Sequence, residues 1–101
     1  MNVVARATLL AFVAKHPDAD ASIRHIYATL RGAKWGTSAD VKATFPSASI
    51  VTAERVVLNV ARNKYRLVIA IDYRRQHVWV KWIGTHAVYD TIDVRTVEHE
   101  P

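Results

Sequence analysis

The ten residues 81–90, "KWIGTHAVYD", gather several groups that can take part in proton transfer or phosphate chemistry. The stretch begins like a strand, breaks at Gly84, and then places His86 and Tyr89 three residues apart. If the chain turns at Gly84 into a helical turn, these two side chains share one side. Histidine carries protons near neutral pH, and Lys81 adds positive charge. The stretch is therefore either a polar turn that ends a sheet or a cluster of reactive groups at its edge.

Positive charge is concentrated in the middle of the chain, which has 101 residues and a net charge of +5. Between residues 55 and 81 the only acidic residue is Asp72, and the cations there are Arg55, Arg62, Lys64, Arg66, Arg74, Arg75 and Lys81. Acidic residues dominate after that, with Asp90, Asp93, Glu98 and Glu100 facing Arg95 alone. A basic balance in a small domain favours an anionic partner, such as nucleic acid or an acidic protein.

Several classes of chemistry fit the composition poorly. The chain has no cysteine, which excludes disulfides, thiolate zinc sites and cysteine nucleophiles and fits a reducing cytoplasm. It has three glycines, none in a phosphate-binding loop, and no nucleophile elbow, although a Ser–His–Asp set stays open. The five histidines show no metal-ligand spacing, and we expect neither a metal nor another cofactor.

The length predicts one compact domain, residues 1–101, and the lack of cysteine fits a location in the cytoplasm. Half of the residues are hydrophobic and 23% are charged, which is typical of a globular protein. No apolar run approaches the ~18 residues that a membrane span needs, so no membrane partner is expected. We interpret the N-terminus as a first helix rather than a signal peptide.

The spacing of apolar residues predicts two antiparallel helices at the N-terminus. The first covers residues 4–16 and ends before Pro17, which disfavours helical geometry at the residue preceding it. The second is expected to be capped by Asp18 or Asp20 and to end at Gly32. It carries one apolar stripe at helical spacing, made of Ile23, Ile26, Tyr27 and Leu30.

Beyond an irregular region with one helical turn at 38–44, three stretches alternate as strands do. They are "ERVVLNVA", "KYRLVIAIDY" and "HVWVKWIG", joined by links too short for parallel crossovers. A short edge strand near 49–52 precedes them. The fold class predicted is α+β, with two N-terminal helices packed on a small antiparallel sheet of three to four strands. A short helix or turn follows from Thr85.

Alternation then assigns the side chains of the sheet to two faces. The face toward the helices is expected to hold Val56, Leu58, Val60, Tyr65, Leu67, Ile69, Ile71, Val78, Val80 and Trp82. The opposite face collects Arg55, Asn59, Lys64, Arg66, Trp79 and Lys81. Cations neutralise phosphates and an aromatic ring stacks on a base, so this face suits single-stranded RNA. The plainer interpretation is a solvated face whose long cations shield the strands.

RNA cleavage by attack of the ribose 2′-hydroxyl needs only a few such groups. It requires a base for the 2′ proton, an acid for the 5′ leaving oxygen, and cations around the developing phosphorane charge. No metal is needed. Histidine, arginine and lysine supply all three functions.

The segments "VKATFPSAS", "LNVARNKYRLVIAIDY" and "VWVKWIGTHAVYD" resemble the HigB-type toxins of bacterial type II toxin–antitoxin modules, in the RelE-like group of mRNA interferases. The resemblance covers roughly residues 25–95, and its most specific parts are "N…NKYRL" and "GTHxxYD". It implies a compact α+β fold and an endoribonuclease that cleaves mRNA, usually on the ribosome, and so inhibits translation. It also implies a cognate antitoxin, often a helix-turn-helix DNA-binding protein.

The resemblance carries over to Asn59, Asn63, Lys64, Arg66, His86, Tyr89 and Asp90. Arg66 and Lys64 are expected to bind the scissile phosphate, His86 to transfer a proton, and Tyr89 to donate a hydrogen bond or stack on a base. The expected RNA-binding residues are Asn59, Asn63, Lys81, Trp79 and Arg55. Two alternatives stay open: a non-catalytic basic module that binds RNA or the ribosome, and a domain that binds only an acidic protein.

Overall fold

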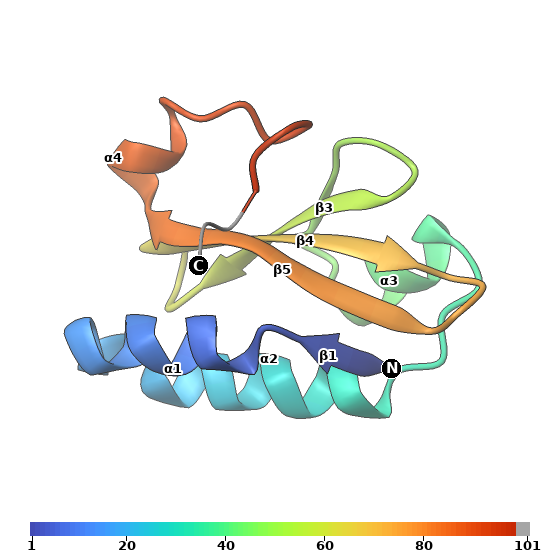
Figure 1. Ribbon diagram of the computed structural model, residues 1–101, viewed down its shortest axis with the longest axis horizontal. Helices are drawn as coiled ribbons and strands as arrows, with labels where there is room; N and C mark the ends of the chain where they lie inside the picture. Colours follow the sequence, from blue (N-terminus) through green and yellow to red (C-terminus); the bar gives the residue numbers. More distant parts are fainter. Residues whose placement is uncertain (99–101) are drawn as a thin grey trace.

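The chain forms a five-stranded sheet with two helices on one face and the C-terminal segment on the other (Figure 1). The computed structural model describes residues 1–98, so His99 and Glu100, which were counted above among the histidines and acids, lie outside the described residues. The elements are β1 (Asn2–Val4), α1 (Arg6–Lys15), a 3-10 turn (Pro17–Ala19), α2 (Asp20–Gly32), α3 (Ser38–Thr44), β2 (Ser49–Ile50), β3 (Arg55–Val60), β4 (Tyr65–Asp72), β5 (His77–Thr85) and α4 (His86–Tyr89).

The strands lie in the order β1-β5-β4-β3-β2. The pairs β2–β3, β3–β4 and β4–β5 are antiparallel, as predicted, and β2 is the expected short edge strand. The prediction of three to four strands, all antiparallel, was incomplete, because β1 adds a parallel strand in which Val3 pairs with Val78. A strand of three residues carries no readable alternation, and its partner lies far along the chain.

Helices α1 and α2 run antiparallel beneath the sheet, as the apolar spacing predicts (Figure 1). The stripe of α2 faces the core, where Ile23, Ile26 and Leu30 are buried. The predicted carboxylate cap is wrong, since Ala19 occupies the N-cap position without a side-chain hydrogen bond. Asp18, in the turn before α2, binds residues of the sheet instead.

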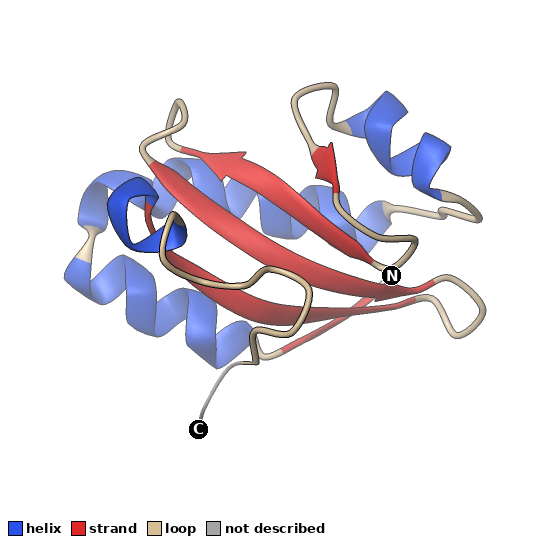
Figure 2. Ribbon diagram, turned by 90° about the horizontal axis from the view of Figure 1, so that it is seen from above, coloured by secondary structure: helices blue, strands red, loops and turns tan. Residues whose placement is uncertain are grey.

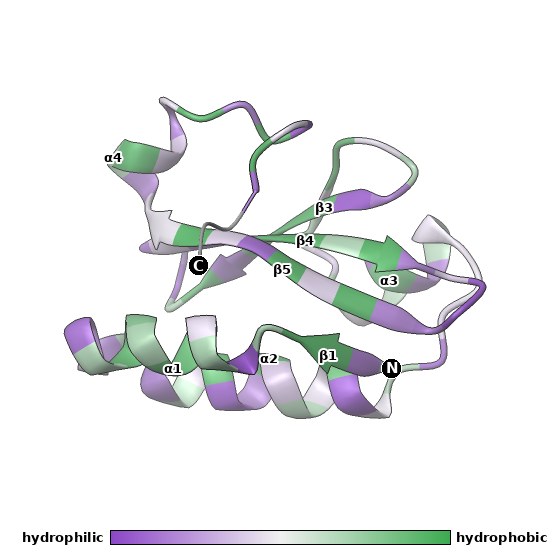
Figure 3. Cartoon of the chain, viewed as in Figure 1, coloured by the Kyte–Doolittle hydropathy of each residue, from purple (hydrophilic) through white to green (hydrophobic). Residues whose placement is uncertain are grey.

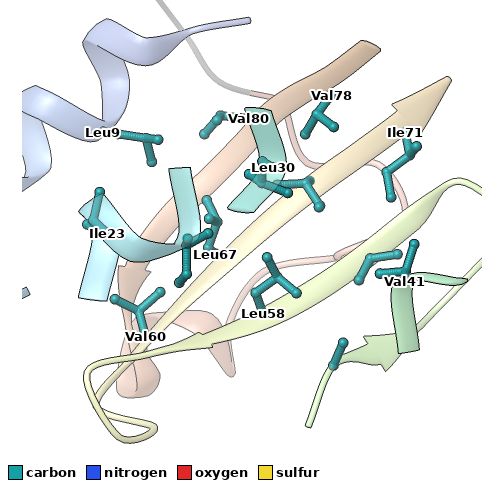
Figure 4. Close-up of a cluster of buried hydrophobic side chains, with 14 of the residues drawn as sticks. Leu9, Ile23, Leu30, Val41, Leu58, Val60, Leu67, Ile71, Val78 and Val80 are labelled. Atoms are coloured by element: carbon teal, nitrogen blue, oxygen red, sulfur yellow. The ribbon is translucent and has the colours of Figure 1, made fainter. Parts of the chain in front are cut away.

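The main core lies between the sheet and these helices (Figure 4). Leu58, Leu67 and Ile69 point into it from β3 and β4 and are at most 1% exposed. Truncating a buried leucine such as Leu67 to alanine typically costs about 2–5 kcal/mol, because it removes apolar contacts and leaves a cavity. This core holds β3, β4 and β5 as a rigid platform for the groups on the opposite face.

The opposite face, called the outer face below, is crossed by α4 and residues 90–98 (Figures 1 and 2). Val57 and Val68 point to this face and are nonetheless buried, at 3% and 0% exposure. Figure 3 shows hydrophobic and hydrophilic positions mixed along β5, which contributes to both faces. Within residues 1–98, each helix is too short or too polar to cross a membrane.

Candidate active site

The outer face of β4 presents Arg66 at the end of the sheet next to the β3–β4 turn. Arg66 lies directly between Asn59 on β3 and Gly84 on β5 in the strand register. The sequence placed both Asn59 and Arg66 on this face, and the structure confirms that placement. Gly84 contributes no side chain of its own at this register position.

The β3–β4 turn fixes the guanidinium of Arg66. Ala61, Arg62 and Asn63 all adopt positive φ angles, of 50°, 54° and 75°, so the chain reverses within a few residues. Asparagine tolerates this left-handed geometry better than most residues. Arg66 Nη1 donates to the side-chain oxygen of Asn63. It also donates to the backbone oxygen of Asn63 at 3.4 Å. Asn63 is thus a positioning residue for Arg66.

Helix α4 brings Tyr89 and His86 to the same end of the sheet. Its first turn is capped by Thr85, whose Oγ1 accepts a hydrogen bond from Val88 N at 3.3 Å. The Tyr89 ring lies 5.7 Å from the guanidinium carbon of Arg66, within cation–π range. The His86 ring lies 6.3 Å from the Tyr89 ring. The predicted grouping of Arg66, His86 and Tyr89 is therefore present in the structure.

The surroundings of His86 leave it open to solvent and to a substrate. Its side chain is 48% exposed, and Asp90 Oδ2 lies 3.7 Å from Nδ1. That separation suits an ion pair with a protonated imidazole but is too long for a hydrogen bond. Asp90 therefore does not fix the imidazole of His86 through a hydrogen bond.

Trp82 was expected in the core, and that prediction is wrong. The β4–β5 register shifts by one residue, with Val68 opposite Trp82 but Ile69 opposite Val80, so β5 has a bulge at Lys81. The bulge turns Trp82 to the outer face, where its ring lies 6.2 Å from the Tyr89 ring. No local pattern marks this bulge, and Trp82 joins the site as a residue that the sequence interpretation missed.

Gly84 does not turn the chain as expected, because β5 continues through it to Thr85. Its role is to make room for the indole of Trp82. A Cβ at this position would lie 2.5 and 2.6 Å from two carbons of that indole. The glycine thus lets Trp82 lie flat against β5 beside Tyr89.

Lys64 was expected beside Arg66, and this placement is also wrong. It lies in the turn before β4, so the alternation of the strand does not extend to it. Its ammonium binds Asp18, which also accepts a hydrogen bond from Tyr65 OH at 2.7 Å, on the helix side of the sheet. The pKa of Asp18 is lowered, first by the hydrogen bond from Lys64 and then by that from Tyr65. The same contact raises the pKa of Lys64.

The remaining predicted RNA-binding residues form a second cluster toward the other end of the outer face. Trp79 pairs with Ala70, four residues along β4 from Arg66, or about 13 Å at the usual rise per residue. Arg55 and Lys81 lie beside it, and both bind the carboxylate of Glu98. They are on the predicted face, but the C-terminal segment pairs with them. An acidic tail after a basic sheet was the sequence signal for that contact.

Together these observations define a class: a small basic α+β protein whose sheet gathers a guanidinium, a phenol and an imidazole at one end of its outer face. The chain belongs to the HigB_toxin family, the RelE-like toxic component of a toxin–antitoxin system, whose model matches residues 19–92. It is thus a toxin whose family implies an antitoxin partner. The match spans α2 to α4 and includes the Arg66, His86 and Tyr89 cluster. A search of the curated proteins gives no match.

Proposed function

We propose that this toxin is an endoribonuclease that cleaves messenger RNA by attack of a ribose 2′-hydroxyl on the adjacent phosphate. The observation that carries the proposal is the convergence of Arg66, Tyr89 and His86 from two separate elements. Arg66 supplies a cation for the phosphate, and His86 supplies an exposed imidazole, the side chain that most often transfers protons in enzymes. Both are needed for this reaction, and neither alone suggests it.

In the proposed reaction, His86 takes the proton of the 2′-hydroxyl while the 2′ oxygen forms a bond to phosphorus. The bond from phosphorus to the 5′ oxygen breaks, and a proton from solvent or a returning imidazolium neutralises that oxygen. The products are a 2′,3′-cyclic phosphate and a 5′-hydroxyl end. Arg66 stabilises the negative charge that develops on the phosphoryl oxygens.

Aromatic and amide groups position the substrate in this scheme. Tyr89 holds the guanidinium of Arg66 over its ring, and its neighbour Trp82 offers a surface on which a base can stack. Asn59, directly opposite Arg66 in the register, lies where its amide can hydrogen-bond a ribose or base. The scheme gives Lys64 no direct part, because its side chain lies on the helix side of the sheet, away from Arg66.

The test is expression without antitoxin, comparing Arg66→Ala and His86→Ala with matched controls. Arg62→Ala removes an exposed cation from the same turn, and His25→Ala removes an exposed histidine from α2. The site variants should lose about 10²–10³-fold in cleavage rate and relieve growth arrest, whereas the controls should not. If both site variants arrest growth as strongly as the wild-type protein, the assignment of Arg66 and His86 to the active site is wrong.

Mapping RNA 5′ ends in induced cells separates cleavage from binding alone. New 5′-hydroxyl ends within translated messages, absent when ribosomes are removed, would support cleavage on the ribosome. Growth arrest without new ends would favour the alternative, a non-catalytic basic module that binds RNA or the ribosome.

The antitoxin is proposed to be a helix-turn-helix DNA-binding protein in the same cytoplasm. A short reading frame for such a protein beside the toxin gene, and its co-purification with this chain, would support that assignment. An adjacent frame of another class that neutralises the toxin would refute it.

A further inference from the structure

The second cluster on the outer face surrounds a hollow of about 560 Å³ that the reaction proposed above does not use. Arg55, Trp79 and Lys81 line it, and Ala70 contributes only a small side chain from β4. Arg74 and two carboxylates, those of Glu54 and Asp72, line it as well. The part of the hollow formed by Arg55, Lys81 and Trp79 combines two cations with an indole and open space on the face that also carries Arg66. Cations and an aromatic ring are the groups that bind a phosphate and an unstacked base.

The two cations already hold an anionic group. Glu98 Oε1 accepts a hydrogen bond from Arg55 Nη2 at 3.0 Å, and Oε2 accepts one from Lys81 Nζ at 2.7 Å. Lys81 and then Arg55 lower the pKa of this carboxyl, which keeps it ionised. A carboxylate bridging two cations occupies the position that a phosphate would take.

The two cations are more enclosed than the carboxylate that they bind. The Arg55 side chain is 13% exposed and that of Lys81 22%, whereas Glu98 is 59% exposed. Arg55 Nη1 also donates to the backbone oxygens of Val97 at 2.6 Å and Val94 at 3.4 Å. The guanidinium would thus stay in place if Glu98 left, and exposed ion pairs of this kind are easily exchanged.

We propose that Arg55, Lys81 and Trp79 form a second nucleotide-binding subsite for single-stranded RNA, whose phosphate position the Glu98 carboxylate occupies in the free protein. This rests on the proposed function, because the same RNA strand would have to reach both Arg66 and this subsite. Trp79 stacks on a base, and the phosphate displaces Glu98 from the cations. Glu98 lies outside the 19–92 family match, so the match itself says nothing of this contact.

RNA fits this subsite better than an acidic protein does. The indole of Trp79 lies in the hollow beside the cations, and a base can use both at once, whereas a carboxylate side chain needs only the cations. The separation from Arg66, about 13 Å along β4, is one that a short RNA strand can bridge.

The experiment measures binding of a short single-stranded RNA with 2′-O-methyl groups throughout, which 2′-hydroxyl attack cannot cleave. Fluorescence anisotropy gives Kd for the wild-type protein, Glu98→Gln and Trp79→Ala. Asp20→Asn is the matched control, because it removes the same charge from the helix side of the sheet. Trp79→Phe keeps a ring at the hollow and guards against a folding defect in Trp79→Ala.

Glu98→Gln should tighten binding several-fold more than Asp20→Asn does, because it frees the two cations. Trp79→Ala should weaken binding about tenfold, and Trp79→Phe should restore most of that loss. Replacing Lys81 with glutamine should lower the slope of log K against log salt by about 0.7.

Three results would overturn the subsite. One is equal binding by Glu98→Gln and Asp20→Asn, and another is unchanged binding by Trp79→Ala. The third is tight binding of a polyglutamate peptide that is insensitive to Trp79→Ala, which would assign the cations to an acidic protein. Cleavage of unmodified RNA is measured in parallel: expected Kd shifts without cleavage refute only the nuclease, and cleavage without the shifts refutes only the subsite.

Discussion

Replacing Gly84 with alanine tests the packing that places Trp82 beside Tyr89. The new methyl would lie 2.5 and 2.6 Å from two indole carbons, roughly 1 Å closer than ordinary carbon contacts allow. The φ angle of Gly84 is not positive, so alanine itself fits the backbone. The cost must therefore come from moving the indole. Overpacking of this size typically destabilises a protein by about 1–3 kcal/mol.

The free energy of unfolding is measured by urea denaturation of Gly84→Ala, Trp82→Ala and the double variant. Without the indole, alanine at position 84 should be neutral or stabilise the strand by about 0.5 kcal/mol, because glycine is the more flexible residue. The two substitutions should then couple by about 2 kcal/mol. An equal cost of Gly84→Ala with and without the indole would show that Trp82 does not lie against Gly84.

Gly84→Ala should also lower the cleavage rate of the folded protein, beyond any loss that unfolding explains. Trp82 lies 6.2 Å from Tyr89, which in turn holds Arg66, so a shift of about 1 Å passes directly to the site. A displacement of that size can cost about 10²-fold in rate. Single-turnover cleavage at a temperature where the variant is folded separates this effect from unfolding.

Three further predictions concern the elements around the site. Folding lowers the pKa of Asp18, so its ionised carboxylate stabilises the folded state. This stabilisation is complete above the pKa of an unfolded carboxyl, about 3.9, and is lost as the pH falls through the lower pKa of the folded state. Urea midpoints should therefore fall less on acidification in Asp18→Asn than in the wild type. Expression of Lys64→Ala should still arrest growth, whereas expression of Arg66→Ala should not. Loss of arrest in both variants would show that Lys64 belongs to the active site. Thr85→Val removes the side-chain cap of α4. It should lower the cleavage rate of the folded protein while changing the free energy of unfolding little, as paired rate and denaturation assays would show.

Local patterns in the sequence were sufficient for the elements that are long and regular. Period-two alternation predicted β3, β4 and most of β5, and helical spacing predicted the buried stripe of α2 with Ile23, Ile26 and Leu30. The edge strand at Ser49–Ile50 and the helical turn Ser38–Thr44 were also predicted. In each case the signal lies in residues that are neighbours along the chain.

Part of the candidate site was predictable for the same reason. Arg66 and Asn59 follow from strand alternation, and His86 and Tyr89 follow from their spacing of three after β5. Their spacing alone could not predict that they lie beside Arg66, because the pairing of β4 with β5 is what brings α4 next to β4. That expectation came from the bend expected at Gly84, which the structure does not show, and the resemblance to the toxin family strengthened it.

The sequence by itself determined the α+β class, the main strands and the concentration of cations along them. Tertiary structure alone decided three placements: Lys64 binds Asp18, Trp82 faces Tyr89, and Arg55 binds Glu98. The physical reason is the same for each. Each depends on something that neighbouring residues do not show. Lys64 lies in a turn, outside the alternation of β4, and the extra residue at Lys81 moves Trp82 to the other face. Arg55 and Glu98 are 43 positions apart and meet only after the chain has folded.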